Sequence, residues 1–503
     1  MLRTGNQYLD GLNDDRSVFL GSERVTNVSV HPAFAGVART VADLFDFKRR
    51  TQEGMRTSTD APDVSFYFEI PRSAESLRKR TELHRLLASA SFGLLGRSPD
   101  YVASFVAGIA AEPQILGAFQ DHILGYREDI ARRDLFLAHA VVAPSDSRTP
   151  ASDSRRVGGG SGCKVVRETD SGVVVSGIKI LATSAAIADE LWVGNVIPLA
   201  ADRASEAITF AVPCATPGLA LWARRPLTSG GSRGGPDLGA SYDEGDTVAV
   251  FDNAFVPWER VFVHGDVSLS RQIYIETPAH SYANHQSCVR FAAKLRVLAG
   301  IAASLLQTLG RTDAAAARDV LGELAAAEAI IDSTLFAQVE QAEFWPGGAA
   351  GYHRRSVYGA MNWCREIYPR LLELLQGLCG SNPLQMPADS IAGLPAELRD
   401  TFDRNWSVAG ASAERRMHLF ALAWEFVGAE FGGRQRLYEE FFAGGSAVLR
   451  SHAFREAPWP EYSRCAERLL DRMSSRGAAP AHGNHAPEDL DAPRSPASTD
   501  ASG

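Results

Sequence analysis

The sequence predicts an α+β fold in which a helical part, an all-β part and a second helical part follow one another. Three observations predict it. Apolar residues recur at helical spacing over residues 73–125, strand-like runs rich in Val, Ile, Phe and Thr fill residues 135–264, and helical spacing returns after residue 281. The 503 residues suffice for about three domains and for a site that encloses a cofactor.

The first helical part contains the runs LRKRTELHRLLASASFGLL and YVASFVAGIAA, with Pro99 between them. Proline interrupts helices, so two helices are expected to be joined by a turn over residues 97–100. The middle part holds the runs KVVRETDSGVVVSGIKI, ELWVGNVI, AITFAVP and DTVAVFDNAFVP, which Gly, Pro, Asp and Asn interrupt. This composition is typical of strands.

Long Ala-, Leu- and Glu-rich stretches follow, including CVRFAAKLRVLAGIAASLLQTL and ERRMHLFALAWEFVGAEF, and their composition is typical of packed bundle helices. From residue 474 the chain has almost nothing to bury, which predicts a disordered tail. We therefore expect an N-terminal helical domain at 1–134, a middle β-domain at 135–268, a C-terminal helical bundle at 269–473 and a tail at 474–503.

Composition excludes several function classes. The formal net charge of −9 offers no basic surface to a nucleic acid. The six cysteines form no C-x-x-C pair or Cys/His cluster, so we expect reduced thiols and no metal site. The N-terminus lacks the apolar core of a signal peptide, and the most apolar stretch, 297–309, is shorter than the about 20 residues of a membrane span. A cytoplasmic protein without membrane contact is expected.

General catalytic motifs are missing as well. The glycine-rich runs at 158–160 and 230–235 open no helix, and the chain has no Rossmann, Walker, G-x-S-x-G or H-E-x-x-H motif. Residue patterns alone therefore indicate a large enzyme-like protein and no particular reaction.

Seven short sequence strings, in a fixed order along the chain, indicate a particular protein family. They are TGNQYLDGLNDDRSVFLG near the start, SFGLLGRSPDY at 91–101, DLFLAHAVVAP at 134–144, KILATSAAIADELWV at 179–193, VFDNAFVPWERVFVHGD at 250–266, HQSCVRFAAKL at 285–295 and EFGGRQRLYEEFFAGG at 430–445. Together they resemble the 4-hydroxyphenylacetate 3-hydroxylase family, the oxygenase component of two-component flavin-dependent aromatic monooxygenases. The resemblance covers roughly residues 3–470.

The resemblance implies an acyl-CoA-dehydrogenase-like fold with a C-terminal four-helix bundle, assembled as a homotetramer. It also implies that a separate NAD(P)H:flavin reductase supplies FADH2, which reacts with O2 to a flavin C4a-hydroperoxide. The distal oxygen then attacks a phenolic ring ortho to its hydroxyl. The substrate is a small phenol, and whether it is free or tethered to a carrier protein stays open, as does FAD against FMN.

The family's phenol site matches three positions here. Its Arg and Tyr, four residues apart, correspond to Arg97 and Tyr101, and its strand His corresponds to His139. A fixed cation stabilises phenolate charge, while a histidine that titrates near neutrality can move a proton. His285 matches a histidine that deprotonates the phenol in the halophenol-hydroxylating branch. The structural alternatives are a turn cation for Arg97, a helix-packing tyrosine for Tyr101, a satisfied core histidine for His139, and a capping or packing role for His285.

The flavin contacts implied by the family fall in three places. A Gln-x-Asp-Arg segment corresponds to Ser145, Asp146, Ser147 and Arg148, of which only the Arg is retained. Arg148 suits the flavin pyrophosphate because a guanidinium pairs two oxygens at once. Thr183 matches a flavin-contacting Thr. A further loop that touches flavin corresponds to Gly444, Gly445, Ser446 and Ala447.

The substrate pocket departs from the family pattern. A Ser-Thr pair that binds the carboxylate of hydroxyphenylacetate corresponds here to Val196 and Ile197. Apolar side chains offer a buried carboxylate no hydrogen bond, so a different para substituent is expected. Asn195 remains a possible donor in this loop.

Three other classes of protein are alternatives to the monooxygenase. An acyl-CoA dehydrogenase has no use for the three phenol-site residues, and the iron–sulfur ligands of the related 4-hydroxybutyryl-CoA dehydratase are missing from residues 91–101, which hold no Cys. The altered flavin segment leaves open a catalytically inactive flavin-binding or scaffold homologue, which would differ from the enzyme in its binding of reduced flavin.

Overall fold

The computed structural model describes residues 2–51, 64–144, 162–228, 236–312, 314–386 and 390–477. The chain divides into two units, 1–455 and 456–503. In the second unit the described element is the helix α15 (Trp459–Gly477). All other elements belong to the first unit. The domain boundaries expected at residues 134, 268 and 473 stay predictions.

The N-terminal part consists of α1 (Gly5–Gly11), α2 (Ala35–Arg50), α3 (Ala74–Ala90), α4 (Pro99–Ala110) and α5 (Gln120–Arg133). Ser73 caps α3 by accepting the N–H of Ser76, and proline occupies the first position of α4, where no N–H donor is needed. The two expected helices are confirmed, but the turn between them spans residues 91–98 and not 97–100, because α4 already begins at Pro99. Two short strands, β1 (Ser17–Leu20) and β2 (Glu23–Val25), were not predicted.

Two main sheets fill the middle of the chain. The larger has the order β2-β1-β8-β9-β5-β4, with β4 (Lys164–Thr169), β5 (Gly172–Thr183), β8 (Leu219–Ala223) and β9 (Asp246–Pro257). The smaller has the order β10-β7-β6-β3, with β3 (Leu137–Ala140), β6 (Glu190–Val193), β7 (Ile208–Pro213) and β10 (Val261–His264). Because β1 pairs in parallel with β8, the N-terminal segment is part of the larger sheet.

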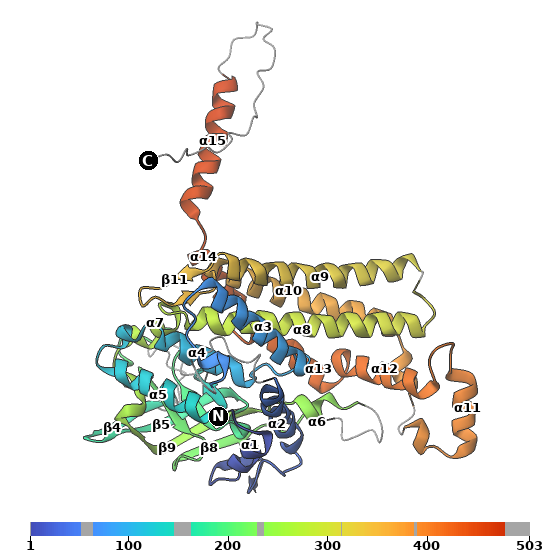
Figure 1. Cartoon of the computed structure of the whole chain (residues 1–503), viewed down its shortest axis with the longest axis horizontal. Helices are drawn as coiled ribbons and strands as arrows, with labels where there is room; N and C mark the ends of the chain where they lie inside the picture. The colour runs from blue at the N-terminus through green and yellow to red at the C-terminus, as the bar shows by residue number, and fades with distance from the viewer. Residues whose placement is uncertain are drawn as a thin grey trace, which may run out of the picture. The chain divides into compact units, whose positions relative to one another are not determined.

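The helices α8 (Ala279–Thr308), α9 (Ala315–Glu340) and α10 (Arg354–Cys379) lie side by side in the C-terminal half (Figure 1). After them come α11 (Ala396–Trp406), α12 (Ala413–Val427), α13 (Glu430–Phe441) and α14 (Ser446–Arg455). The short helix α6 (Leu238–Tyr242) lies between β8 and β9, and α7 (Leu269–Ile275) leads from β10 into α8. Helices with apolar residues on several faces bury them by packing on one another, as in other bundles.

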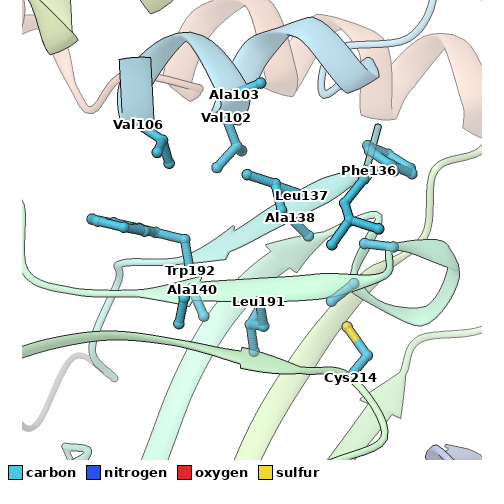
Figure 2. Packing of buried hydrophobic residues seen from close by; sticks show 14 of the residues in the cluster. Val102, Ala103, Val106, Phe136, Leu137, Ala138, Ala140, Leu191, Trp192 and Cys214 are labelled. Atoms are coloured by element: carbon cyan, nitrogen blue, oxygen red, sulfur yellow. The ribbon is translucent and has the colours of Figure 1, made fainter. Parts of the chain in front are cut away.

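The packing of α4 on the smaller sheet places the site. Every residue of α4 is buried. Figure 2 shows Val102 and Val106 of α4 facing Leu137 and Ala138 of β3, with Trp192 of β6 beside them. Since β3 and β6 are adjacent parallel strands, the helix covers both. The turn before α4 is thereby brought to the strand that carries His139.

A helix that spans a membrane needs about 20 predominantly apolar residues. No single described helix is long and apolar enough to cross a membrane, although the bent pair 99–110 and 113–133 passes the length and composition test together.

Candidate active site

The turn between α3 and α4 carries Arg97 and is fixed from two sides. Gly93 has a φ of +67°, which glycine adopts readily, and a Cβ there would lie 2.4 Å from the carbonyl oxygen of Arg290 on α8. The carboxylate of Glu244 accepts the backbone N–H groups of Gly96 at 2.8 Å and Arg97 at 2.5 Å. The turn is therefore held against both the bundle and the segment before β9.

The guanidinium group of Arg97 is buried and only partly paired. Its Nη1 donates to the hydroxyl of Tyr438 at 2.6 Å, and its Nη2 donates to the carbonyl of Phe442 at 3.0 Å. Its Cζ lies 4.0 Å from the ring centroid of Tyr101, a cation–π contact. The buried Nε has no partner. Because buried donors are normally paired, this N–H indicates a place for a ligand acceptor.

His139 lies beside the same tyrosine. The rings of His139 and Tyr101 meet edge to face with centroids 5.8 Å apart, and Phe105 packs against both. The Nδ1 atom of His139 is buried and has no hydrogen-bond partner. The structure thus brings together Arg97, Tyr101 and His139, and leaves one donor and one ring nitrogen among them unpaired.

The electrostatics of the site differ from the sequence-based expectation. Burial, together with the positive charge of Arg97, lowers the pKa of His139 to about 3. Burial raises the pKa of Tyr101, and Arg97 opposes that rise. A histidine that titrates near neutrality was expected here, and the structure gives instead a neutral imidazole. At pH 7 the imidazole is therefore uncharged.

Because His139 is neutral in the folded protein, the wild type should lose more stability in acid than a variant without this histidine. With a folded-state pKa of about 3 and an ordinary value of 6.5, the imidazole takes up a proton only in the unfolded chain between these pH values. Stability therefore falls as pH falls from 6.5 to 3. Between pH 7.5 and pH 5 we expect His139→Gln to lose about 2 kcal/mol less unfolding free energy than the wild type. Urea denaturation at both pH values measures it, and equal losses would contradict the low pKa.

His285 lies in a separate buried network. Its Nδ1 is 2.6 Å from Oε1 of Gln338, its Nε2 is 2.9 Å from the hydroxyl of Thr81, and its ring stacks on Tyr352 at 3.6 Å. Burial lowers its pKa well below the ordinary value, and His84 adds to the effect. Both ring nitrogens are therefore used by protein groups, which favours a packing role for His285. A capping role is wrong, because His285 lies inside α8.

The structure describes only some of the residues that were expected to contact flavin. Residues 145–148 lie outside the described residues. The hydroxyl of Thr183 donates to Asp246 at 2.7 Å, so in this state it serves a contact between strands. Gly444 and Gly445 precede α14, which begins at Ser446 and continues through Ala447. The N–H of Gly444 already donates to the carbonyl of Phe441 at 2.9 Å. The first N–H groups of a helix have no partner within it, so Ser446 and Ala447 offer backbone donors to a cofactor.

The loop after β6 was expected to line the substrate pocket with apolar side chains at residues 196 and 197. Val196 and Ile197 are partly exposed, at 36% and 38%. Asn195 is buried, its Oδ1 accepts from Nζ of Lys179 at 2.8 Å, and its Nδ2 donates to the carbonyl of Glu206 at 2.8 Å. The Asn195 side chain is therefore already occupied by protein groups.

Two residues that shape the site were missed in the sequence. Tyr438 and Glu244 contact the Arg97 turn directly, yet they lie 341 and 147 residues away along the chain. The string EFGGRQRLYEEFFAGG contains Tyr438 and was part of the resemblance. Membership in that string was the one sequence feature that could have indicated Tyr438.

Comparison with known proteins identifies the family. Residues 4–263 match the family described as 4-hydroxyphenylacetate 3-hydroxylase N terminal, and residues 270–471 match 4-hydroxyphenylacetate 3-hydroxylase C terminal. The chain belongs to the 4-hydroxyphenylacetate 3-hydroxylase family. The predicted family and its enzyme class, an FAD-dependent aromatic monooxygenase, are thereby confirmed.

Two curated relatives are 31% identical. One is the pyoverdin chromophore biosynthetic protein PvcC of Pseudomonas aeruginosa, matched over 89% of this chain and 90% of its own length. The other is the Streptomyces globisporus monooxygenase of (3S)-3-amino-3-(3-chloro-4-hydroxyphenyl)propanoyl-[peptidyl-carrier protein SgcC2], matched over 89% of this chain and 86% of its own length. Only the second of these two names states a substrate, a hydroxyphenyl group bound to a peptidyl-carrier protein.

A solved structure supports the fold. The oxygenase component HpaB of 4-hydroxyphenylacetate 3-monooxygenase, complexed with FAD and 4-hydroxyphenylacetate, is 28% identical, with a TM-score of 0.89 over 94% of this chain and 100% of that chain. The predicted α+β, acyl-CoA-dehydrogenase-like fold is confirmed. In the described part of the chain, no group of three or more His, Cys, Asp or Glu side chains is placed to hold a metal ion.

Proposed function

We propose that this chain hydroxylates a phenolic ring ortho to its hydroxyl, using O2 and FADH2 delivered by a separate NAD(P)H:flavin reductase, through a flavin C4a-hydroperoxide. The observation that carries the proposal is the pair of unpaired buried atoms around Tyr101: Nε of Arg97 and Nδ1 of His139. A phenol oxygen can satisfy both, because it accepts from the first and bonds the second. Buried polar groups held ready for a ligand are typical of binding sites.

The protein's own residues then have distinct tasks. Arg97 favours the phenolate, whose ring is the better nucleophile, because an adjacent fixed cation lowers the pKa of an acid. His139 is neutral at pH 7 and hydrogen-bonds the oxygen at Nδ1. Tyr101 and Phe105 form apolar walls that exclude water and orient the ring.

The flavin site is proposed around residues 145–148, Thr183 and the loop 444–447. When bound, FADH2 supplies the activated oxygen that enters the ring. The start of α14 fits such a cofactor because its backbone donors can meet a flavin carbonyl or phosphate. Phe442, whose carbonyl holds Arg97, lies two residues before Gly444. The proposed flavin loop and the phenol site are thus continuous in the chain.

We expect the substrate to carry no small carboxylate at the position para to the hydroxyl. Val196 and Ile197 offer no hydrogen bond, and Asn195 is already paired. The wild type should therefore prefer a neutral para-alkyl phenol to 4-hydroxyphenylacetate. The double variant Val196→Ser, Ile197→Thr should improve kcat/KM for 4-hydroxyphenylacetate about tenfold, the equivalent of one hydrogen bond to a charged group. Steady-state kinetics on both substrates test this, and an unchanged preference would place the carboxylate elsewhere.

Assembly as a homotetramer is part of the proposal. The helix α15 carries Leu469, Leu470 and Met473 on one face, each more than 60% exposed. Exposed apolar faces of this kind are usual at subunit contacts. Light scattering on the full chain tests the proposal, and the mass of a monomer would contradict it.

The reaction itself is tested by mixing the full chain anaerobically with reduced FAD, adding oxygen and screening phenols for products that gain one oxygen. Formation of a catechol from at least one phenol is the expected result. If the flavin oxidises at its free-solution rate with every phenol, the inactive flavin-binding or scaffold alternative replaces the enzyme.

A further inference from the structure

Tyr438 on α13 holds both ends of the Arg97 segment. Its hydroxyl donates to the carbonyl of Gly96 at 2.8 Å and accepts from Nη1 of Arg97 at 2.6 Å. Its ring centroid lies 5.1 Å from Cζ of the same arginine. One side chain therefore fixes the backbone before Arg97 and the guanidinium group itself.

The ring of Tyr438 is itself well fixed. It stacks on Phe442 with centroids 5.4 Å apart, and the guanidinium groups of Arg290 and Arg434 lie over it at 5.2 Å and 5.0 Å. Glycine at position 96 makes this approach possible, since a Cβ there would lie 2.3 Å from Cζ of the tyrosine ring. A side chain packed on this many sides has few other rotamers open to it.

The contacts from α13 also decide which atom of Arg97 stays unpaired. The hydroxyl of Tyr438 accepts a hydrogen bond from Nη1, and the carbonyl of Phe442 accepts one from Nη2. The edge of the guanidinium with both terminal nitrogens therefore faces α13. The Nε atom is the buried one left without a partner. A planar guanidinium has a fixed fork geometry, so holding two of its nitrogens sets the direction of the third.

We propose that Tyr438 is a positioning residue that aims Arg97 at the phenol oxygen and so sets how readily the bound phenol ionises. The inference rests on the proposed function, because it assigns the phenol to the same site. Without the hydroxyl, Nη1 loses its acceptor and the guanidinium turns to find another. The charge then lies farther from the phenol oxygen and stabilises its anion less.

The test is a titration of bound 4-nitrophenol, whose phenolate absorbs visible light while its neutral form does not. The full chain is saturated with 4-nitrophenol, and absorbance is recorded against pH. In the wild type, bound nitrophenol should ionise at lower pH than free nitrophenol. In Tyr438→Phe the midpoint should move back toward the free value by about one pH unit, the equivalent of one hydrogen bond.

Tyr368→Phe is the matched control. Tyr368 is also a buried tyrosine of the bundle, and its hydroxyl has no hydrogen-bond partner, so its removal should leave the midpoint unchanged. A second variant, Gly96→Ala, keeps the hydroxyl but displaces the Tyr438 ring, and it should give the same shift as Tyr438→Phe. If Tyr438→Phe does not fold, the midpoint measured for Gly96→Ala decides whether Tyr438 positions Arg97.

The outcomes separate the two proposals. If the wild type does not lower the ionisation midpoint of nitrophenol, the proposed phenol site fails. If the wild type lowers it and neither Tyr438→Phe nor Gly96→Ala moves it back, the phenol site stands and the role of Tyr438 is wrong. A merely structural tyrosine would alter the melting temperature and leave the midpoint where it is.

Discussion

Replacing Arg97 by methionine is expected to lower kcat/KM for hydroxylation about 10²–10³-fold, the usual effect of removing one preorganised group that stabilises developing charge. Methionine keeps much of the side-chain volume and loses the charge. The backbone N–H of residue 97 still reaches Glu244, so the turn keeps its anchor. The phenol then stays protonated and its ring reacts poorly, although oxygen is still consumed.

The measurement is the ratio of hydroxylated product to oxygen consumed, with hydrogen peroxide determined in parallel. Arg97→Met should turn most of the oxygen into peroxide. Arg97→Lys is the matched variant, since it keeps a positive charge but lacks the planar fork that meets Tyr438 and Phe442. It should fall between the wild type and Arg97→Met. A product-to-oxygen ratio in Arg97→Met equal to that of the wild type would remove Arg97 from the reaction.

The part of this site that lies close in sequence could be predicted. Arg97 and Tyr101 are one helical turn apart across a proline, and the change of hydrophobic period at residue 135 marks where His139 enters a strand. The family resemblance named all three as candidates, and the local pattern alone named none of them. The short strands β1 and β2 were missed because SVFL and ERV are too brief to show a period.

The remainder depends on tertiary packing and has no local signal. The low pKa of His139 arises from burial and from Arg97, which approaches from another element. His285 is the first residue of a string that matched the family, but its neighbours Thr81 and Gln338 come from two other helices. Partners 204 and 53 residues away along the chain cannot be identified from spacing.

The largest stability effect is expected at Glu439, at the centre of a buried ion cluster on α8 and α13. Its carboxylate oxygens meet Nη1 and Nη2 of Arg290 at 2.7 Å and 2.8 Å and Nζ of Lys294 at 2.5 Å. All three side chains are at most 2% exposed. Arg290 also donates to the carbonyl of Gly93, so the cluster supports the turn that carries Arg97.

Glu439→Gln leaves two buried cations without a counter-charge and should lower the unfolding free energy by about 3–5 kcal/mol. Glu328→Gln is the control, because Glu328 pairs with Arg296 at the surface and should cost at most about 1 kcal/mol. Urea denaturation at pH 7 measures both. Equal effects of the two substitutions would show that the cluster contributes no more than a surface pair.

The pH dependence gives an independent check on the same carboxylate. Burial raises the pKa of Glu439, but Arg290 and Lys294 outweigh burial and bring it to about 2, against an ordinary value of 4.5. A depressed pKa means that the unfolded chain takes up the proton first as pH falls. The stabilisation is therefore complete above pH 4.5 and is lost between 4.5 and 2.

Wild type and Glu439→Gln should accordingly converge in stability as pH drops through that window. Replacing the whole cluster, with Arg290→Met, Lys294→Met and Glu439→Leu, should recover much of the loss at pH 7, since an apolar set needs no counter-charge. The recovered protein would still lack the donor that Arg290 gives to Gly93. A stable triple variant with impaired hydroxylation would thus show that the cluster serves the Arg97 turn as well as the fold.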